Sequence, residues 1–183
     1  MPARYSDLIP GAKMSKEWRK KVIGEGKNMG GATASKVEKW QRLCLEKIVK
    51  QKVAKTNLRL NHSTKKLEVV PRPSTRPDEF EWTEDFDGEF YIGKTRYLVN
   101  FKMIVGAGGA QTRSLREVYH FIKCQEAHVK KFNVHMKDTK FLNILDGDTL
   151  GNKMAAMRLA QTKATVSQIY IGDTHELKKS WPF

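Results

Sequence analysis

The chain of 183 residues has few cysteines and no long apolar run. Its two cysteines, Cys44 and Cys124, fall within helical patterns and cannot form the dense cross-links of a secreted disulfide scaffold. No stretch approaches the ~20 apolar residues that a membrane span requires. Residues 1–21 contain no apolar segment typical of a signal peptide. We therefore expect free thiols, no membrane segment and a cytoplasmic (intracellular) location.

Several arrangements of catalytic and ligand-binding residues are also missing. The five histidines show no zinc-ligand spacing with the two cysteines. Lys27 lies in a glycine-containing segment, but neither a Gly-Lys-Ser/Thr sequence nor a preceding strand accompanies it. The order of serine, histidine and aspartate residues supports no catalytic triad. The sequence thus argues against a zinc site, a phosphate-binding loop and a serine hydrolase.

Positive charge, in contrast, is abundant, with 34 Lys/Arg against 20 Asp/Glu and a net charge of +14. Residues 1–66 hold 17 basic and 5 acidic side chains, and residues 94–183 hold 15 and 7. Between them, residues 67–93 hold 2 basic and 8 acidic side chains. The basic surface predicts a polyanionic partner, most often nucleic acid. The acidic segment is either a solvated loop or part of a site that holds a metal cation.

Apolar periodicity and turn residues predict an α/β (α+β) fold in which helices alternate with strands. Ser35 with Glu38, and Ser114 with Glu117, form capping-box patterns that predict two helix starts. The expected order is a helix at 36–55, a loop from 71 leading into a strand, two strands within 89–105 joined by a turn at Gly93-Lys94, a helix from 114 to about 131, a strand at 140–148, a helix at 149–161, a strand at 166–173 and a tail at 174–183. We expect a mixed central sheet flanked by helices, with residues 1–66 as a basic N-terminal arm and helix and residues 67–183 as the core.

Two polar side chains interrupt the strand "RYLVNFKMIV". Because side chains alternate along a strand, Asn100 and Lys102 share one face with Leu98 and Ile104. A hairpin pairing would bring Asp87 to the same region. A carboxylate beside a residue-x-Lys pair is the layout of a metal-dependent phosphodiesterase, in which the carboxylate helps to hold Mg²⁺ and the lysine assists the attacking water.

Residues 86–177 resemble the catalytic core of the PD-(D/E)xK nucleases, particularly the small type II restriction endonucleases. The matching pieces are "FDGEF", "YLVNFK", the glycine loop "GAGGAQ" with "SLREVY", "FLNILDGD" and "VSQIYIGDTHEL". In that family an Asp ends one strand, an acidic residue-x-Lys pair lies on the next, and a helix and a third strand follow. The resemblance implies a restriction-endonuclease-like sheet, Asp87 and Asn100 as Mg²⁺ ligands, and Lys102 as the catalytic lysine.

The chain departs from the family at Asn100, where Glu or Asp is expected, and three interpretations remain open. Asn100 is a neutral oxygen ligand of a natural variant site, or Glu117 on the following helix supplies the acid, or Asn100 replaces an original aspartate in an inactivated form. For Glu117, the competing role is its place in the capping box. Asp85 is an alternative to Asp87, which we prefer because Phe86 and Gly88 flank it as the family pattern suggests.

The resemblance implies an Mg²⁺-dependent endonuclease that hydrolyses duplex DNA, as a homodimer or as the cleavage subunit of a larger recognition partner. A repair nuclease or junction resolvase of the same fold, and a DNA-binding protein whose metal site is degraded, are the alternatives. Positions beside the glycine loop and on the first helix are the expected DNA contacts: Gln111, Arg113, Arg116, Lys36 and Arg42.

Overall fold

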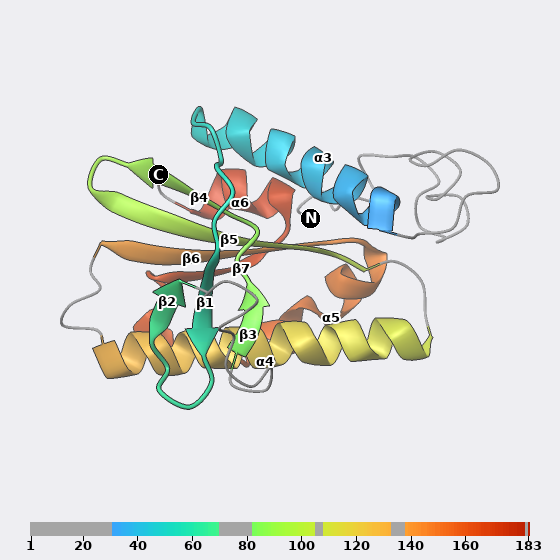
Figure 1. The fold of residues 1–183 in the computed structure, drawn as a ribbon. Coiled ribbons are helices and arrows are strands. Elements are labelled where there is room, and N and C mark those ends of the chain that lie inside the picture. Colours follow the sequence, from blue (N-terminus) through green and yellow to red (C-terminus); the bar gives the residue numbers. More distant parts are fainter. Residues whose placement is uncertain (1–30, 70–81, 105–107, 133–137, 182) are drawn as a thin grey trace, which may run out of the picture.

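A computed structural model of the chain describes residues 31–69, 82–104, 108–132, 138–181 and 183 (Figure 1). Its main elements form a central sheet with helices on both faces, as the sequence predicts. The elements in chain order are α3 (Gly31–Val49), β1 (Leu58–Asn61), β2 (Leu67–Val69), β3 (Trp82–Asp85), β4 (Gly88–Ile92), β5 (Thr95–Met103), α4 (Gly109–Phe132), β6 (Thr139–Asp146), α5 (Asp148–Arg158), a 3₁₀ turn (Lys163–Thr165), β7 (Ile169–Gly172) and α6 (Thr174–Ser180).

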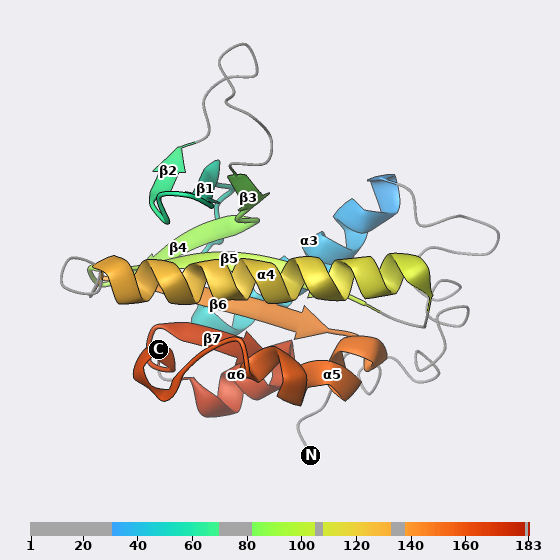
Figure 2. The same ribbon diagram turned by 90° about the horizontal axis from the view of Figure 1, so that it is seen from below.

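The central sheet is mixed, with strand order β4-β5-β6-β7. β4 and β5 form the predicted antiparallel hairpin, whose pairing runs from Gly88 opposite Val99 to Ile92 opposite Thr95. β6 is parallel to β5, and β7 is parallel to β6. α4 covers one face of this sheet, whereas α3 and α6 cover the other (Figures 1 and 2).

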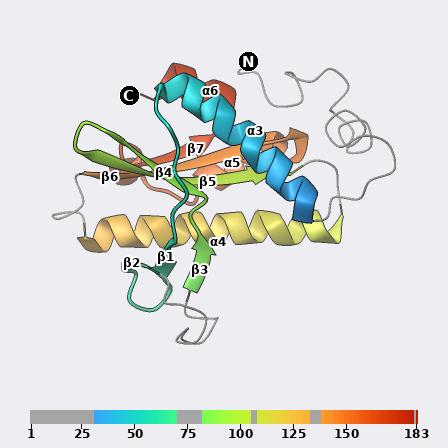
Figure 3. The ribbon, with the colours of Figure 1, turned by 45° about the horizontal axis from the view of Figure 1, so that its top comes forward.

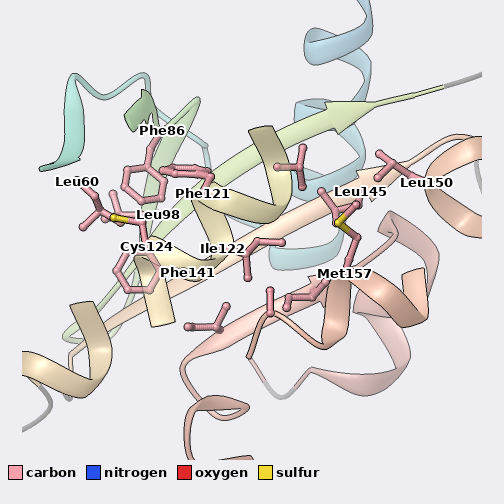
Figure 4. Packing of buried hydrophobic residues seen from close by; sticks show 14 of the residues in the cluster. Leu60, Phe86, Leu98, Phe121, Ile122, Cys124, Phe141, Leu145, Leu150 and Met157 are labelled. Atoms are coloured by element: carbon pink, nitrogen blue, oxygen red, sulfur yellow. The ribbon is translucent and has the colours of Figure 1, made fainter. Parts of the chain in front are cut away.

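The side chains of β5 alternate between the two faces as predicted. Leu98 belongs to the core beneath α4, while Val99 and Phe101 belong to the core beneath α3 and α6. Beneath α4, Phe86 packs against the Phe121 and Phe141 rings, with centroid separations of 4.9 and 5.5 Å (Figure 4). Each large side chain buried there contributes roughly 1.5–3 kcal/mol. The two cores therefore fix the faces toward which Asn100 and Lys102 point.

The predicted starts of the two long helices are wrong. α3 spans Gly31–Val49 rather than residues 36–55, and α4 begins at Gly109, five residues before Ser114. The N–H of Thr112 already donates to the Gly108 carbonyl, at 3.0 Å, so the helical hydrogen bonds continue through the predicted cap. A capping-box pattern specifies a start only where the preceding backbone leaves the helical conformation.

A second, three-stranded sheet of order β2-β1-β3 was not predicted (Figure 3). Residues 82–85 form β3 rather than a loop, and β3 pairs antiparallel to β1. A cross-strand ion pair between Arg59 and Asp85 joins these strands. With three or four residues each, the strands are too short to show a clear alternation of apolar positions. The predicted boundary between residues 66 and 67 falls between β1 and β2, within this sheet.

The predicted C-terminal tail contains a helix, α6, across Thr174–Ser180. Its cap is the Asp173 carboxylate, which accepts a hydrogen bond of 2.7 Å from the Glu176 N–H. The spacing Asp-x-x-Glu was a start signal that the sequence reading missed. In the described part of the chain, no helix has the length and apolarity needed to cross a lipid bilayer.

Candidate functional site

The β4–β5 hairpin holds Asp87 beside Asn100. Asp87 immediately precedes β4, and its N–H donates to the Val99 carbonyl at 2.8 Å. Its Oδ2 accepts a hydrogen bond of 2.6 Å from the Phe101 N–H. Because Gly88 pairs with Val99, Asp87 occupies the position next to Asn100 in the antiparallel register. Asp87 is thus fixed on either side of Asn100, its backbone N–H by the Val99 carbonyl and its carboxylate by the Phe101 N–H.

The environment of Asp87 disfavours its charged form. The pKa of this carboxyl is raised to about 7, above all by burial and also by the nearby charges of Glu38 and Glu84. The Phe101 N–H and the Lys102 ammonium act in the opposite direction and lower the pKa. Lys102, Glu38 and Glu84, on β5, α3 and β3, therefore each lie within electrostatic reach of Asp87.

Lys102 lies at the end of β5 and binds Glu84 of β3. The distance from its Nζ to Glu84 Oε2 is 2.7 Å, and the two side chains are 28% and 37% exposed. The ammonium is thus held at the surface of the cluster, where it remains accessible to solvent. Sequence reasoning missed Glu84, although the acidic composition of residues 67–93 was a signal that a carboxylate of this segment could reach the site.

Asn100 is part of a buried amide network. Its Nδ2 donates to Asn143 Oδ1 at 3.2 Å, and Asn143 exchanges hydrogen bonds of 2.7 and 2.9 Å with Gln125 of α4. Asn143 Nδ2 also donates to the Tyr170 carbonyl at 3.2 Å. Asn100 is 1% exposed, yet its Oδ1 has no hydrogen-bond partner in the described part of the chain. An unpaired buried acceptor costs about 1–3 kcal/mol, so this oxygen requires an explanation.

α3 supports the site from the opposite face of the sheet. Arg42 donates to the Asp87 carbonyl at 2.6 Å and to the Val53 carbonyl at 2.9 Å, and it pairs with Glu38 at 2.7 Å. Its side chain is only 14% exposed, so Arg42, an expected DNA contact, has its donors directed into the protein. Gln41 adds a bond of 3.2 Å to the Lys102 carbonyl. These contacts fix the backbone at both ends of the site.

A surface hollow of about 540 Å³ adjoins Glu84. It is lined by His62, Glu84, Arg113, Arg116, Glu117, His120 and Phe121. Arg113, Arg116 and Glu117 are exposed on α4, so two of the expected DNA contacts and the alternative acid share one surface with the partner of Lys102. Gln111 lies in the first turn of α4, half-buried. Lys36 lies in α3, but its side chain is outside the part of the structure that is described.

Asp85, the alternative to Asp87, is paired with Arg59 in the small sheet. Its carboxylate is 48% exposed and pairs with Arg59 on the neighbouring strand β1. Asp85 therefore joins two strands of the small sheet, whereas Asp87 is bound to the backbone of β5. The geometry accordingly favours Asp87 as the member of the candidate site.

The donor atoms fit a divalent cation in part. Across the described ranges, no group of three or more His, Cys, Asp or Glu side chains is placed to hold a metal ion. Mg²⁺, however, commonly binds through one or two carboxylates, with water and substrate phosphate completing its ligands. The Asp87 carboxylate and the unpartnered Asn100 Oδ1 are oxygen donors of the right type. Among the residues that the structure describes, this arrangement is compatible with a site of few protein ligands but not with a preformed three-carboxylate site.

No family model, curated protein or solved structure matches the chain.

Proposed function

We propose that the protein is a metal-dependent endonuclease that hydrolyses phosphodiester bonds of duplex DNA, with a restriction-endonuclease-like fold. The observation that carries this proposal is the hairpin that holds Asp87 beside Asn100 and within electrostatic reach of Lys102. The nuclease resemblance implies an Asp at the end of one strand, an acidic residue-x-Lys pair on the next, then a helix and a third strand. The chain has Asp87 immediately before β4, the residue-x-Lys pair on β5, then α4 and the parallel strand β6.

In this proposal each residue has a separate role at the scissile phosphate. A bound Mg²⁺ would stabilise the charge that develops on the scissile phosphate and lower the pKa of the attacking water. The Asp87 carboxylate and the Asn100 carbonyl oxygen would hold that ion. The Lys102 ammonium would offset phosphate charge and orient the water, after leaving Glu84. The 2.6 Å bond from the Phe101 N–H keeps one Asp87 oxygen fixed, which leaves the other for the metal.

The charge of the chain supports a DNA substrate. Its net charge of +14 favours a polyanion, and Arg113 and Arg116 are exposed beside the hollow that Glu84 lines. Phosphate contacts by such side chains would position the duplex with a scissile bond near Lys102. Each subunit of a homodimer would then cut one strand, or a larger recognition subunit would direct the cleavage chain. A type II restriction enzyme is our leading assignment within the fold, ahead of a repair nuclease or junction resolvase.

Two observations favour a second candidate, a DNA-binding protein without catalysis. Position 100 carries an amide that is already bonded to Asn143, and the described residues include no three-carboxylate metal group. A nuclease fold that has lost its metal site would retain this packing together with the basic surface. Both candidates predict DNA binding that weakens steeply with salt, so salt dependence does not separate them.

The deciding experiment incubates the purified protein with plasmid DNA and Mg²⁺ or Mn²⁺. The nuclease proposal predicts discrete fragments that disappear in Lys102→Ala and Asp87→Asn, while filter binding shows that both variants still bind DNA. The matched control is Lys94→Ala, an exposed lysine in the hairpin turn at the other end of β5. Intact plasmid with all proteins, alongside normal DNA binding, would favour the non-catalytic candidate.

A further inference from the structure

The buried hydrogen-bond partners around position 100 favour an amide there over a carboxylate. Asn143 Nδ2 donates to the Tyr170 carbonyl and to Gln125, so Asn143 must present its Oδ1 to β5. That oxygen accepts hydrogen bonds from Gln125 Nε2 and from Asn100 Nδ2, so an ionised aspartate at position 100 would place two acceptors opposite each other. Nδ2 of Asn100 is bound to Asn143, whereas its buried Oδ1 has no hydrogen-bond partner in the described part of the chain. Position 100 therefore offers an oxygen but lacks negative charge.

Glu84 lies where the missing charge is needed. It is the second-last residue of β3, the strand that leads into the turn carrying Asp87, and its Oε2 is 2.7 Å from Lys102 Nζ. Asp87 follows it three positions later in the chain, and the charge of Glu84 is one of those that raise the pKa of Asp87. A divalent cation would relieve the repulsion between them. In this structure the Lys102 ammonium offsets part of that repulsion through its ion pair with Glu84.

We propose that Glu84 supplies the second carboxylate of the divalent-cation site, in place of the acid that position 100 lacks. This inference rests on the proposed nuclease function and deepens it. Asp87 and Glu84 contribute the charge, and Asn100 Oδ1 contributes a buried neutral oxygen. Cation binding displaces Lys102 from Glu84, so the same event that fills the site frees the ammonium for the phosphate. Asn143 and Gln125 are positioning residues, because they act through the orientation of Asn100.

Two other carboxylates lie near the site, and their surroundings distinguish them from Glu84. Glu38 is on α3, on the opposite face from Asn100 and Lys102, and it pairs with Arg42, whose other donors are bound to backbone carbonyls. Releasing Glu38 would disturb those bonds. Glu117 is exposed on α4 and lines the hollow with Glu84. Only Glu84 has an ion pair with the proposed catalytic lysine among the described contacts.

The test is calorimetric titration of the full chain with Mn²⁺, without DNA, at pH 8, where the Asp87 carboxyl is ionised. We expect Glu84→Gln to weaken Mn²⁺ binding about tenfold or more. Glu89→Gln is the matched control and should bind as wild type does, since Glu89 is a partly exposed carboxylate on β4, 3.9 Å from Arg96. Glu38→Gln should also retain wild-type affinity, and thermal denaturation confirms that each variant is folded.

The Lys102→Met variant tests whether Glu84 binds the metal ion or serves only as the ion-pair partner of Lys102. If Glu84 binds the cation, removing the competing ammonium leaves Mn²⁺ affinity equal to or above that of wild type, while plasmid cleavage is lost. If Glu84 only positions Lys102, then Glu84→Gln binds Mn²⁺ with wild-type affinity, and this result overturns the inference. A loss of Mn²⁺ affinity in Glu38→Gln with none in Glu84→Gln overturns it as well.

The outcomes also separate this inference from the proposed function. Wild-type protein that binds Mn²⁺ and cuts plasmid, together with unimpaired Mn²⁺ binding by Glu84→Gln, would reject the role of Glu84 and uphold the nuclease. Wild-type protein that neither binds Mn²⁺ nor cuts plasmid would reject both.

Discussion

Replacing Asn143 by aspartate should destabilise the protein strongly and in a pH-dependent way. Asn143 is fully buried, and its Nδ2 donates to Gln125 Oε1 at 2.7 Å and to the Tyr170 carbonyl at 3.2 Å. The substitution changes the side-chain volume little. At both contacts, however, it replaces the N–H donor by a carboxylate oxygen, so that two acceptors face each other. Each unpaired buried acceptor costs about 1–3 kcal/mol, so we expect a loss of about 3 kcal/mol or more in the free energy of unfolding.

The pH dependence follows from the buried position of the new carboxyl. Burial raises its pKa in the folded protein above the unfolded value of about 3.9. The folded state then binds the proton more tightly, so stability is greatest below the unfolded pKa and is lost as pH rises toward the folded pKa. This loss, measured against wild type, amounts to about 1.4 kcal/mol per pH unit within that window. The loss of stability in Asn143→Asp, relative to wild type, should therefore be larger at pH 7 than at pH 5.

Urea denaturation followed by tryptophan fluorescence at the two pH values measures both effects. With a urea dependence of about 2 kcal/mol per M, a loss of 3 kcal/mol lowers the midpoint by roughly 1.5 M. Asn57→Asp, at an exposed asparagine between α3 and β1, is the control and should keep the wild-type midpoint. An Asn143→Asp midpoint equal to that of wild type, or equally lowered at both pH values, would refute the network as described.

Three further substitutions or conditions test the site and its support. Mn²⁺ affinity should fall about tenfold per pH unit below pH 7 in calorimetric titrations, because burial raises the pKa of Asp87 to about 7 and its protonated form cannot bind the ion. Arg42→Met should lower the free energy of unfolding in urea by about 2–3 kcal/mol, since the Val53 and Asp87 carbonyls lose their donor. Gly147→Ala should cost about 3 kcal/mol in the same assay, because Gly147 has a φ of 100° and an added Cβ would meet the Ile104 carbonyl. Unchanged affinities or midpoints would contradict the corresponding contacts.

The central sheet could be predicted because its strands carry strong local signals. Successive side chains of β5 point to opposite faces of the sheet, and Gly93, with a φ of 59°, lies in the turn where the sequence predicted one. β6, buried on both faces, reads as the apolar run "FLNIL". These signals depend only on neighbours along the chain, so the sequence alone was sufficient to predict that Asp87 lies near β5. They also predicted the shared face of Asn100 and Lys102.

The parts that could not be predicted depend on partners far apart in the sequence. β1 and β3 are short, and the Arg59–Asp85 ion pair that joins them has no periodicity to reveal it. The position of Glu84 beside Lys102 follows from that pairing, so it was hidden for the same reason. The inward direction of Arg42 likewise depends on carbonyls that the loop after α3 and the start of β4 present. A lysine- and arginine-rich helix looks solvent-facing when only its own sequence is considered.

The amide network also bears on whether Asn100 is native or an inactivating replacement. An aspartate at position 100 would face Asn143 Oδ1, and Asn143 cannot reverse its amide without opposing its own Oδ1 to the Tyr170 carbonyl. We therefore expect Asn100→Asp to lower the free energy of unfolding by about 1–3 kcal/mol and to leave plasmid cleavage no greater than in wild type. Cleavage that appears only in Asn100→Asp would contradict this argument, because it would mean that an aspartate belongs at position 100 and that the network accommodates it.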